Sequence, residues 1–553
     1  MYSNKANINI LTTLLVEHGV SHAVICPGSR NAPIAHNLNT CPEIECFPVT
    51  DERSAGFYAL GIAQYTGQPT AVCVTSGTAL LNVLPAVAEA YYQHVPIIVI
   101  SADRPLAWID QQDGQTIPQT DALGKFVRKA VSLPEPHDET EHWLCNRLVN
   151  EALIACKESG GTPVHINVPI SEPLFDFSIE TLPTERAFQL SESTESAECY
   201  RDIEEEFLKS QRPMIVIGQI NRFEAAYISE CVDCLQDKMT VIYESLSIAP
   251  ALHIDKVLGS MESEDDYLPD AILYIGGTLV SKRLKQFLRH ATNAKTWIVN
   301  RSGNIYDTFQ NLYHVIEGRP GYILDNTSTA IRRKIEFGDF VLSHDFHAKW
   351  QQLFANAAHK TQLLTPEYSQ IAVVKEFCKR LSVAEPYHLH AANSMSVRLV
   401  DTFAEEYVSC NRGTNGIEGS LSTAAGFSLI ASLPTYCVIG DLSFFYDSNA
   451  LWNQNLHGNF RILLLNNGCG GIFNKFPGLQ DSPARESLVM ASHHTSAEGL
   501  CQSYHIEYHA IHNLSELNGT TMQEWMSSDS DRPSLLEIFT DAETDTREFA
   551  KYI

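Results

Sequence analysis

The sequence predicts an α/β protein of three domains, each built on a parallel sheet flanked by helices. One observation is the rhythm of the chain, in which short apolar runs alternate with helical patterns, as is typical of parallel sheets covered by helices. The other is its length of 553 residues, which is too long for one hydrophobic core. At about 100 to 200 residues per domain, we expect about three domains.

The first predicted domain covers residues 1–180. Apolar runs at 21–28, 44–50, 69–76, 95–102 and 164–170 are its expected strands, with amphipathic or small-residue helices between them. Residues 171 to about 205 are rich in Ser, Glu, Thr and Pro and lack a strong period. This composition is typical of a linker that runs over the surface.

The central domain is predicted over residues 205–340 and the third over 360–553. Expected strands of the central domain lie at 213–220, 240–245, 270–277 and 295–300, and its end falls somewhere between 325 and 360. Expected strands of the third lie at 387–393, 434–441, 461–468, 505–511 and 534–540. The first and third domains have a similar length and rhythm, although no repeat of individual residues is visible.

Composition disfavours several classes of protein. The 39 basic and 66 acidic residues give a net charge of −27, which argues against nucleic acid or an anionic membrane as a partner. No run of about 18 apolar residues is present, and the N-terminus lacks the pattern of a signal peptide, so we expect a cytoplasmic enzyme. The 14 cysteines are scattered, and only Cys231 and Cys234 have C-x-x-C spacing, which disfavours zinc sites and disulfides. Anionic substrates would require a local concentration of basic residues.

A metal site is predicted where two strands of the third domain end. Asp441 closes the strand at 434–441, and Asn467 lies near the end of the strand at 461–468, with a crossover helix expected at 448–458. Open α/β sheets present ligand sites beyond the carboxyl ends of their strands. A carboxylate from Asp441, an amide oxygen from Asn467 and a backbone carbonyl near Cys469 would suit Mg²⁺.

Glycines follow these residues and suggest a phosphate site. Gly468, Gly470 and Gly471 allow the backbone to approach phosphate closely, and exposed N–H groups there could form an anion nest. An ordinary strand end followed by turn asparagines is the alternative, but the combined spacing makes it the weaker one.

The spacing of these residues resembles a known fingerprint. Gly440-Asp441, with Asn467 placed 27 residues after Gly440, is similar to the thiamine diphosphate motif of the acetolactate synthase and pyruvate decarboxylase superfamily. The usual third residue of that motif is Gly, and here it is Leu442. Gly440-Asp441-Leu442-Ser443 instead resembles the synthase family of the menaquinone pathway.

Other segments carry the same resemblance along nearly the whole chain. They are Cys26-Pro27-Gly28-Ser29-Arg30, Asp51-Glu52-Arg53, Thr75-Ser76-Gly77-Thr78-Ala79, Ala102-Asp103-Arg104-Pro105, Asn411-Arg412-Gly413 and Leu421-Ser422-Thr423-Ala424-Ala425-Gly426. The central domain is supported mainly by Lys282-Arg283-Leu284 and is the least specific part.

The resemblance implies a thiamine diphosphate-binding fold, with a pyrimidine-binding first domain and a diphosphate-binding third domain. The implied cofactors are thiamine diphosphate and Mg²⁺, with Mn²⁺ as an alternative, and the implied metal ligands are Asp441, Asn467 and Cys469. Ile417 would lie beneath the cofactor and enforce its bent shape, unless it is a core residue. The full set of implied cofactor contacts is Pro27, Gly28, Ser29, Glu52, Thr78, Asn82, Ile417, Gly440, Asp441, Leu442, Ser443, Asn467, Cys469, Gly470, Gly471 and Ile472.

Glu52 is the implied catalytic residue. In the superfamily a glutamate bonded to the pyrimidine nitrogen shifts the tautomer and makes the cofactor's own amine a base. The alternative is a helix-N-terminal acid stabilised by the helix dipole, which is common for Asp-Glu starts. Thr78 and Asn82 resemble residues near the pyrimidine, with helix capping and surface polarity as their alternatives.

The resemblance further implies a transferase that decarboxylates 2-oxoglutarate and adds the succinyl carbanion to isochorismate. Both substrates are carboxylates, for which Arg is a suitable partner. The succinyl carboxylate would contact Asn393, Ser394, Arg398 and Arg412, and isochorismate would face Arg30, Arg104, Gln115, Lys282 and Arg283. Ile472 and Phe473 would form an apolar wall, while Phe476 stands where some relatives carry Leu.

The implied assembly is a homo-oligomer, a dimer or a tetramer, with each active site between the first domain of one subunit and the third of another. Two alternatives to this function stay open: a related thiamine diphosphate carboligase or decarboxylase that uses another 2-oxo acid, and a cofactor-binding protein without turnover. The first domain lacks the adjacent histidines of pyruvate decarboxylases, which disfavours simple aldehyde release. We expect His493-His494, in the third domain, to be a solvated turn.

Overall fold

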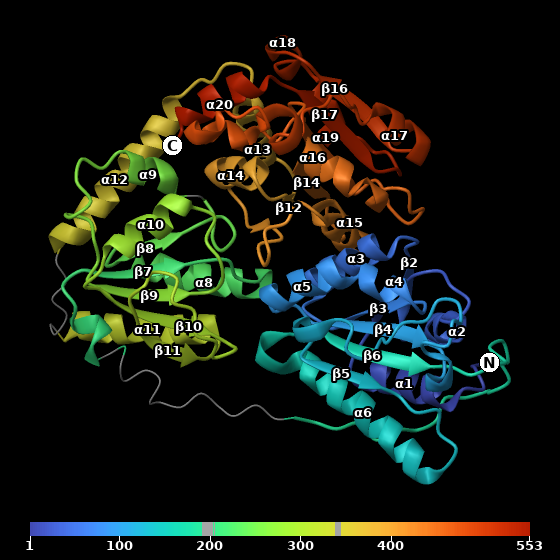
Figure 1. Cartoon of the computed structure of the whole chain (residues 1–553). Coiled ribbons are helices and arrows are strands. Elements are labelled where there is room, and N and C mark those ends of the chain that lie inside the picture. Colours follow the sequence, from blue (N-terminus) through green and yellow to red (C-terminus); the bar gives the residue numbers. More distant parts are fainter. Residues whose placement is uncertain (191–202, 204, 251, 338–343) are drawn as a thin grey trace.

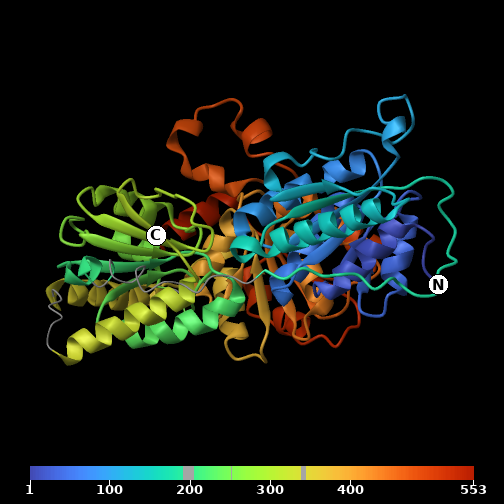
Figure 2. The ribbon, with the colours of Figure 1, turned by 90° about the horizontal axis from the view of Figure 1, so that it is seen from below.

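The computed structural model describes residues 1–190, 203, 205–250, 252–337 and 344–553. Three parallel sheets flanked by helices form three units that pack against one another (Figure 1), which confirms the predicted fold class. Figure 2 shows the first and central units on opposite sides, with parts of the third unit between them. Among the described residues, no helix is long and apolar enough to cross a membrane.

The first unit has a six-stranded sheet in the order β2-β1-β3-β4-β6-β5. Its strands are β1 (His22–Ile25), β2 (Glu45–Pro48), β3 (Thr70–Val74), β4 (Ile97–Asp103), β5 (Lys129–Ser132) and β6 (Val164–Pro169). Its helices are α1 (Ala6–Glu17), α2 (Ala32–Thr40), α3 (Glu52–Thr66), α4 (Thr78–Asn82), α5 (Leu84–Gln93) and α6 (Glu139–Lys157). β5 was not among the predicted strands. β3 and β4 are buried along their whole length, as expected for strands covered by helices on both faces.

The central unit has a five-stranded sheet in the order β11-β10-β9-β7-β8. Its strands are β7 (Pro213–Ile217), β8 (Thr240–Tyr243), β9 (Ala271–Ile275), β10 (Lys295–Asn300) and β11 (Leu312–Glu317). Its helices are α8 (Arg222–Leu235), α9 (Ile254–Gly259), α10 (Lys282–His290), α11 (Pro320–Glu336) and α12 (His344–Leu363). The predicted range ends at 340, but Trp350 of α12 is fully buried and contacts Phe287 of α10, so this unit continues beyond 340.

The third unit repeats the topology of the first, because its sheet runs β13-β12-β14-β15-β17-β16. Its strands are β12 (His388–Ala391), β13 (Val408–Ser409), β14 (Thr435–Gly440), β15 (Phe460–Asn466), β16 (Glu507–Ile511) and β17 (Ser534–Phe539). Its helices are α13 (Gln370–Leu381), α14 (Met395–Phe403), α15 (Ser420–Ile430), α16 (Asp441–Tyr446), α17 (Glu498–Tyr504), α18 (Leu514–Leu517), α19 (Thr521–Met526) and α20 (Ala542–Ala550). Numbered within each unit, the strand order is the same in both sheets, so the similar rhythm seen in the sequence corresponds to a repeated topology.

One predicted element of the third unit is wrong. A crossover helix was expected at 448–458, but the helix after β14 is α16, which begins at Asp441, and only a 3₁₀ turn at Ser448–Ala450 follows it. Asn449 and Asn453 instead form hydrogen bonds with the first unit, to Ser54 and Tyr58. The segment therefore connects two units, while its buried residues Ala450, Leu451 and Leu456 belong to the core that includes β14 and β15.

The first and third units join where α3 crosses α15. α3 begins after Asp51, whose side chain accepts a hydrogen bond from the Arg53 N–H, and it is followed by Gly67, which has φ 67°. In the middle of the contact, a methyl group at Gly61 would overlap the Thr423 carbonyl, and one at Gly426 would overlap the Tyr58 backbone. The two backbones touch because neither position has a side chain.

We predict that Gly426→Ala destabilises the protein. The added methyl group must push α15 away from α3, and overpacking of this kind costs about 1 to 3 kcal/mol. Thermal unfolding should therefore begin at a lower temperature. Gly499→Ala is the matched control, because a methyl group at Gly499 of α17 meets nothing within 4 Å. An equal melting temperature for Gly426→Ala and wild type would contradict the proposed close contact.

Candidate active site

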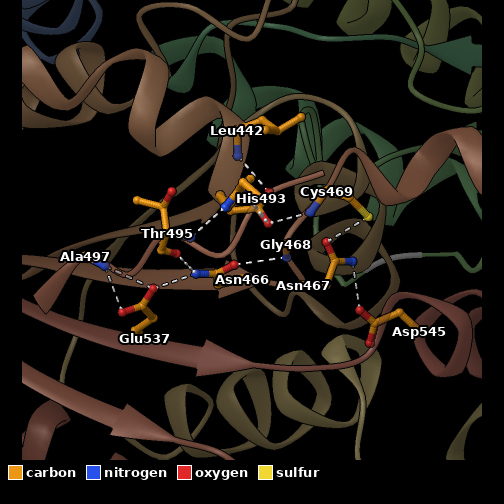
Figure 3. Close-up of polar contacts among 11 residues, drawn as sticks. Leu442, Asn466, Asn467, Gly468, Cys469, His493, Thr495, Ala497, Glu537 and Asp545 are labelled. Atoms are coloured by element: carbon orange, nitrogen blue, oxygen red, sulfur yellow. Dashed lines mark hydrogen bonds and ion pairs between the residues drawn. The ribbon is translucent and has the colours of Figure 1, made fainter. Parts of the chain in front are cut away.

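Two polar residues follow neighbouring strands of the third sheet. β14 and β15 pair in parallel with Gly440 opposite Leu465, and Asp441 and Asn467 come directly after these strands. The carboxyl ends of parallel strands meet at one edge of a sheet. As predicted, Asp441 and Asn467 therefore lie at the same edge of the sheet. Figure 3 shows the loop that carries Asn467.

Asp441 is a buried carboxylate held mainly by backbone amides. One oxygen accepts from the Leu442 N–H at 2.7 Å, and the other accepts from the Cys469 N–H at 3.1 Å. Burial raises the pKa of Asp441, while the nearby amides and His493 lower it in part. A divalent cation would supply the positive charge that this environment lacks.

The amide of Asn467 is oriented by an acid from the end of the chain. Its Nδ2 donates to Asp545 Oδ2 at 3.0 Å, so its Oδ1 points away from Asp545 and has the Cys469 thiol at 3.8 Å. The carbonyl oxygen of Cys469 accepts from the Gly471 N–H at 2.9 Å, which leaves a second lone pair. A buried carboxylate, an amide oxygen and a carbonyl are hard oxygen donors, so the three residues fit Mg²⁺ or Mn²⁺.

His493 does not form the solvated turn that the sequence suggested. Its Nδ1 accepts from the Thr495 N–H at 3.1 Å, so a neutral ring carries its proton on Nε2, which lies 3.5 Å from Asp441 Oδ2. The ring packs edge-on against Phe445, with centroids 5.5 Å apart. The next residue, His494, is exposed as expected. A long-range contact of this kind has no signal in the local sequence.

Asn466 stabilises the same loop from the other side. Its Nδ2 donates to the buried Glu537 at 2.7 Å and to the Thr495 carbonyl at 2.9 Å. Its Oδ1 accepts from the Gly468 N–H at 3.1 Å. Of the two adjacent asparagines, Asn467 is thus turned toward Asp545 and Cys469, while Asn466 holds the loop to the sheet (Figure 3).

The predicted nest of free N–H groups is not present in this structure. The glycine amides of the loop all donate to oxygen atoms of the chain: Gly468 to Asn466 Oδ1, Gly470 to the Met490 carbonyl and Gly471 to the Cys469 carbonyl. The loop still needs glycine at position 471, because a methyl group there would lie 2.8 Å from Asn467 Nδ2. Gly440, Leu442 and Ser443 lie beside Asp441 at the end of β14 and the start of α16.

Glu52 opens α3 and lines a cleft of the first unit. Its Oε2 accepts from Asn82 Nδ2 at 3.2 Å, and Thr78 and Gln115 line the same cleft. The structure therefore brings together four residues that the sequence singled out separately. Among the described residues the lining runs from Glu52 to Ile117, all within the first unit, so the loop that carries Asn467 in the same chain does not line this cleft.

The loop of Pro27, Gly28 and Ser29 follows β1 and is exposed. Gly28 packs closely against Thr75, since a methyl group added at Gly28 would lie 2.5 Å from Thr75 Cβ. This contact holds the loop next to Thr75, one of the residues that line the Glu52 cleft. The predicted contacts of this loop with a cofactor stay a prediction.

Four of the predicted substrate residues meet at the ends of β12 and β13. Arg412 is buried and donates to Asn393 Oδ1 at 3.1 Å and to the Leu279 carbonyl at 3.2 Å. Arg398 donates to the Ser394 carbonyl. Burial lowers the pKa of Arg398, and the neighbouring Arg412 lowers it further. Asp255 and Glu244 act in the opposite direction, and the two close cations suit an anionic ligand.

A cavity of about 680 Å³ lies where the three units meet, and Arg412 lines it. Lys285 of α10 also lines it, and both burial and Arg412 lower the pKa of Lys285. The predicted cations Lys282 and Arg283 are exposed at the start of α10, with Arg283 donating to the Asp255 carbonyl at 3.2 Å. Sequence reasoning missed Lys285, although its position three residues after Lys282 on one helix was a usable signal.

The predicted cations of the first unit are already paired within the chain. Arg30 is buried and bonds Glu172 at 3.1 Å and the Ile170 carbonyl at 3.0 Å. Arg104 bonds Asp113 at 3.1 Å. A substrate carboxylate would have to replace or share these partners.

The predicted apolar contacts lie in loops. Ile472 and Phe473 are half-buried on a 3₁₀ turn at Gly471–Lys475, and Phe476 is exposed with its ring centroid 6.4 Å from that of Phe473. Ile417 is 38% exposed in the loop after Arg412, so it is not a core residue of this chain. Single exposed apolar side chains are common on protein surfaces, so the contact of Ile417 with a cofactor stays a prediction.

Comparison with known proteins gives two findings. A family model described as the N-terminal TPP binding domain of thiamine pyrophosphate enzymes matches residues 8–123. Relatives called 2-succinyl-5-enolpyruvyl-6-hydroxy-3-cyclohexene-1-carboxylate synthase match along the chain. The one from Phocaeicola vulgatus is 41% identical, covering 100% of this chain and 98% of its own. The one from Bacteroides thetaiotaomicron is 40% identical, covering 100% of this chain and 99% of its own. The one from Flavobacterium johnsoniae is 35% identical, covering 94% of each chain.

A buried acid beside the site predicts how stability changes with pH. Asp447 follows α16 and accepts from the Ser422 N–H and hydroxyl at 2.8 and 2.7 Å, and burial raises its pKa to about 7. Between the ordinary aspartate pKa of about 3.9 and this value, the folded protein binds a proton that the unfolded chain does not. The contribution of Asp447 to stability therefore falls as pH rises through this window.

We expect Asp447→Asn to remove this pH dependence. The melting temperature of the variant, relative to that of wild type, should rise between about pH 4 and pH 7 and level off above pH 7, by an amount equivalent to a few kcal/mol, about 1.4 kcal/mol per unit of pKa shift. Thermal unfolding at several pH values measures it. A difference between the two proteins that stays constant with pH would contradict the raised pKa.

Proposed function

The chain belongs to the 2-succinyl-5-enolpyruvyl-6-hydroxy-3-cyclohexene-1-carboxylate synthase family of thiamine pyrophosphate enzymes, and we propose that it performs that family's reaction. In this reaction 2-oxoglutarate loses carbon dioxide and its remaining succinyl unit is added to isochorismate, as a step of menaquinone biosynthesis. The observation that carries the proposal is the cleft of Glu52, Thr78, Asn82 and Gln115, because it assembles the predicted first-unit residues in a chain that matches the family from end to end.

We propose that Asp441, Asn467 and the Cys469 carbonyl hold Mg²⁺, or Mn²⁺ in its place, and through it the diphosphate of the cofactor. Support comes from the oxygen donor set and from the buried charge of Asp441. When bound, the cofactor supplies the electron sink that decarboxylation needs. Pro27, Gly28, Ser29 and Ile417 are the proposed contacts to its other parts.

Glu52 is the proposed proton-holding residue. Asn82 donates to its Oε2, which leaves Oε1 as the oxygen that can share a proton with a pyrimidine nitrogen. The residue opens a helix, so the backbone holds its position while the carboxyl group faces the cleft. Acid–base roles of this kind need a fixed group within hydrogen-bond reach of the reacting atom.

A homo-oligomer, either a dimer or a tetramer, is part of the proposal. The Glu52 cleft is lined by the first unit alone among the described residues, which supports a second copy that brings its own metal-binding loop to the cleft. An obligate interface of this sort buries about 2,000 Å² or more. A cytoplasmic location remains a prediction from the sequence.

The proposed substrate contacts divide between the units. Asn393, Ser394, Arg398 and Arg412 would bind the succinyl carboxylate, and their closeness in the structure supports one shared anion. For isochorismate the proposed contacts are Arg30, Arg104, Gln115, Lys282 and Arg283, with Ile472, Phe473 and Phe476 as apolar neighbours. With substrate bound, these apolar groups would shield the reacting atoms from water, which favours addition over protonation.

The first test removes the acid of Glu52. With thiamine diphosphate, Mg²⁺, 2-oxoglutarate and isochorismate, the wild-type protein should release carbon dioxide and form the adduct. Glu52→Gln should lower kcat by about a hundredfold to ten-thousandfold, the range of general acid–base catalysis. Glu17→Gln, which changes an exposed glutamate at the end of α1, is the matched control. Unchanged product formation by Glu52→Gln would remove the catalytic role.

The second test concerns the choice of 2-oxo acid. Loss of a charge-assisted hydrogen bond costs about 1.5 to 3 kcal/mol, so Arg398→Gln should lower kcat/KM for 2-oxoglutarate about tenfold to hundredfold. Pyruvate has no second carboxylate, and its much slower decarboxylation should change little. Arg532→Gln, at an exposed position, is the control. If Arg398→Gln lowers kcat/KM equally for both 2-oxo acids, Arg398 does not bind the succinyl carboxylate.

A further inference from the structure

The last helix of the chain places a buried carboxylate beside the metal-binding loop. Asp545 lies in α20, is 9% exposed, and accepts three hydrogen bonds. Its Oδ1 accepts from the Gln370 N–H at 2.7 Å. Its Oδ2 accepts from Thr540 Oγ1 at 2.8 Å and from Asn467 Nδ2 at 3.0 Å. The two oxygens thus have separate partners, one in α13 and the other at the candidate site.

The chemistry of this contact decides how the Asn467 amide is turned. An ionised carboxylate only accepts hydrogen bonds, so the side of the amide that faces Asp545 must be the NH₂ group. Turning the amide over would place two oxygen atoms about 3 Å apart without a proton between them. The Asn467 oxygen is therefore held on the opposite side, next to Cys469.

The backbone at Gly471 also limits the orientations that the Asn467 amide can adopt. A methyl group at Gly471 would lie 2.8 Å from Asn467 Nδ2, so the loop packs directly against the amide nitrogen. Asn467 is thus confined between Gly471 and Asp545. Figure 3 shows the Asn467 amide with its nitrogen toward Asp545 and its oxygen toward the Cys469 sulfur.

We propose that Asp545 is a positioning residue that sets the Asn467 amide so that its oxygen is presented to the divalent cation. The proposal rests on the metal-binding role proposed for Asn467. Groups behind metal ligands typically change metal affinity about tenfold to a hundredfold when altered. Asp545 would act in this way from 78 residues further along the chain.

The isosteric change Asp545→Asn gives the sharpest test. The new amide can keep its bond to the Gln370 N–H only with its oxygen on that side, which directs its NH₂ group at Asn467. Asn467 must then turn its own oxygen toward position 545 and its nitrogen toward the cation. Affinity for Mn²⁺, measured on the full-length protein with thiamine diphosphate by electron paramagnetic resonance of free Mn²⁺, should fall about tenfold to a hundredfold.

A second variant distinguishes orientation from general damage. Asn467→Asp alone should also bind Mn²⁺ weakly, because it places two carboxylates face to face. The double variant Asp545→Asn with Asn467→Asp exchanges donor and acceptor, and a carboxylate presents oxygen on both sides. We expect the double variant to regain Mn²⁺ affinity. Thr540→Val, which removes the other donor to Oδ2, is the matched control and should bind Mn²⁺ as wild type does.

The outcomes separate this proposal from the metal site itself. Wild-type Mn²⁺ affinity in Asn467→Ala would overturn the metal-binding role and the positioning role with it. Loss of affinity in Asn467→Ala together with wild-type affinity in Asp545→Asn would overturn the positioning role alone. Failure of the double variant to regain Mn²⁺ affinity would also overturn the positioning role. In that case, exchanging the hydrogen-bond donor and acceptor between positions 545 and 467 would not restore metal binding.

Discussion

The contact of α3 with α15 is the constraint on which the rest of this structure depends. Gly61 and Gly426 let the two helix backbones touch, and the hydrophobic core continues from the first unit into the third across them. α3 begins at Glu52, and α15 follows the loop of Arg412. The same close approach therefore fixes both the candidate acid and a candidate substrate cation. Buried Glu89 adds to it by accepting from the backbone N–H groups beside Arg412.

The first and third units use one topology for two different purposes. Both sheets have the same strand order, and in each some of the candidate residues follow the two central strands. In the third unit, Asp441 and Asn467 follow β14 and β15. In the first, β3 leads into the wall of the Glu52 cleft and β4 leads to Arg104. The repeat persists without repeated residues, because alternating apolar strands and helices are enough to specify a parallel sheet.

Buried acids connect the third unit to its loops. Asp441, Asp447 and Asp545 each accept hydrogen bonds from backbone amides or neutral side chains. Burial raises the pKa of all three, so they carry their charge at a cost that the amide donors only partly offset. At Asp441 a cation would relieve this cost. At Asp447 and Asp545 the same chemistry instead fixes the positions of segments close to the site.

The sequence by itself determined the fold class, the strand ends at Asp441 and Asn467, and the helix that starts at Glu52, because these follow from local periodicity and motif spacing. Only the tertiary structure decided that residues 448–458 contact the first unit, that His493 faces Asp441, and that Lys285 lines the central cavity. It also placed Asp545 behind Asn467. These contacts join residues far apart in the chain, and no local pattern encodes which distant side chains will meet once the helices and sheets have packed.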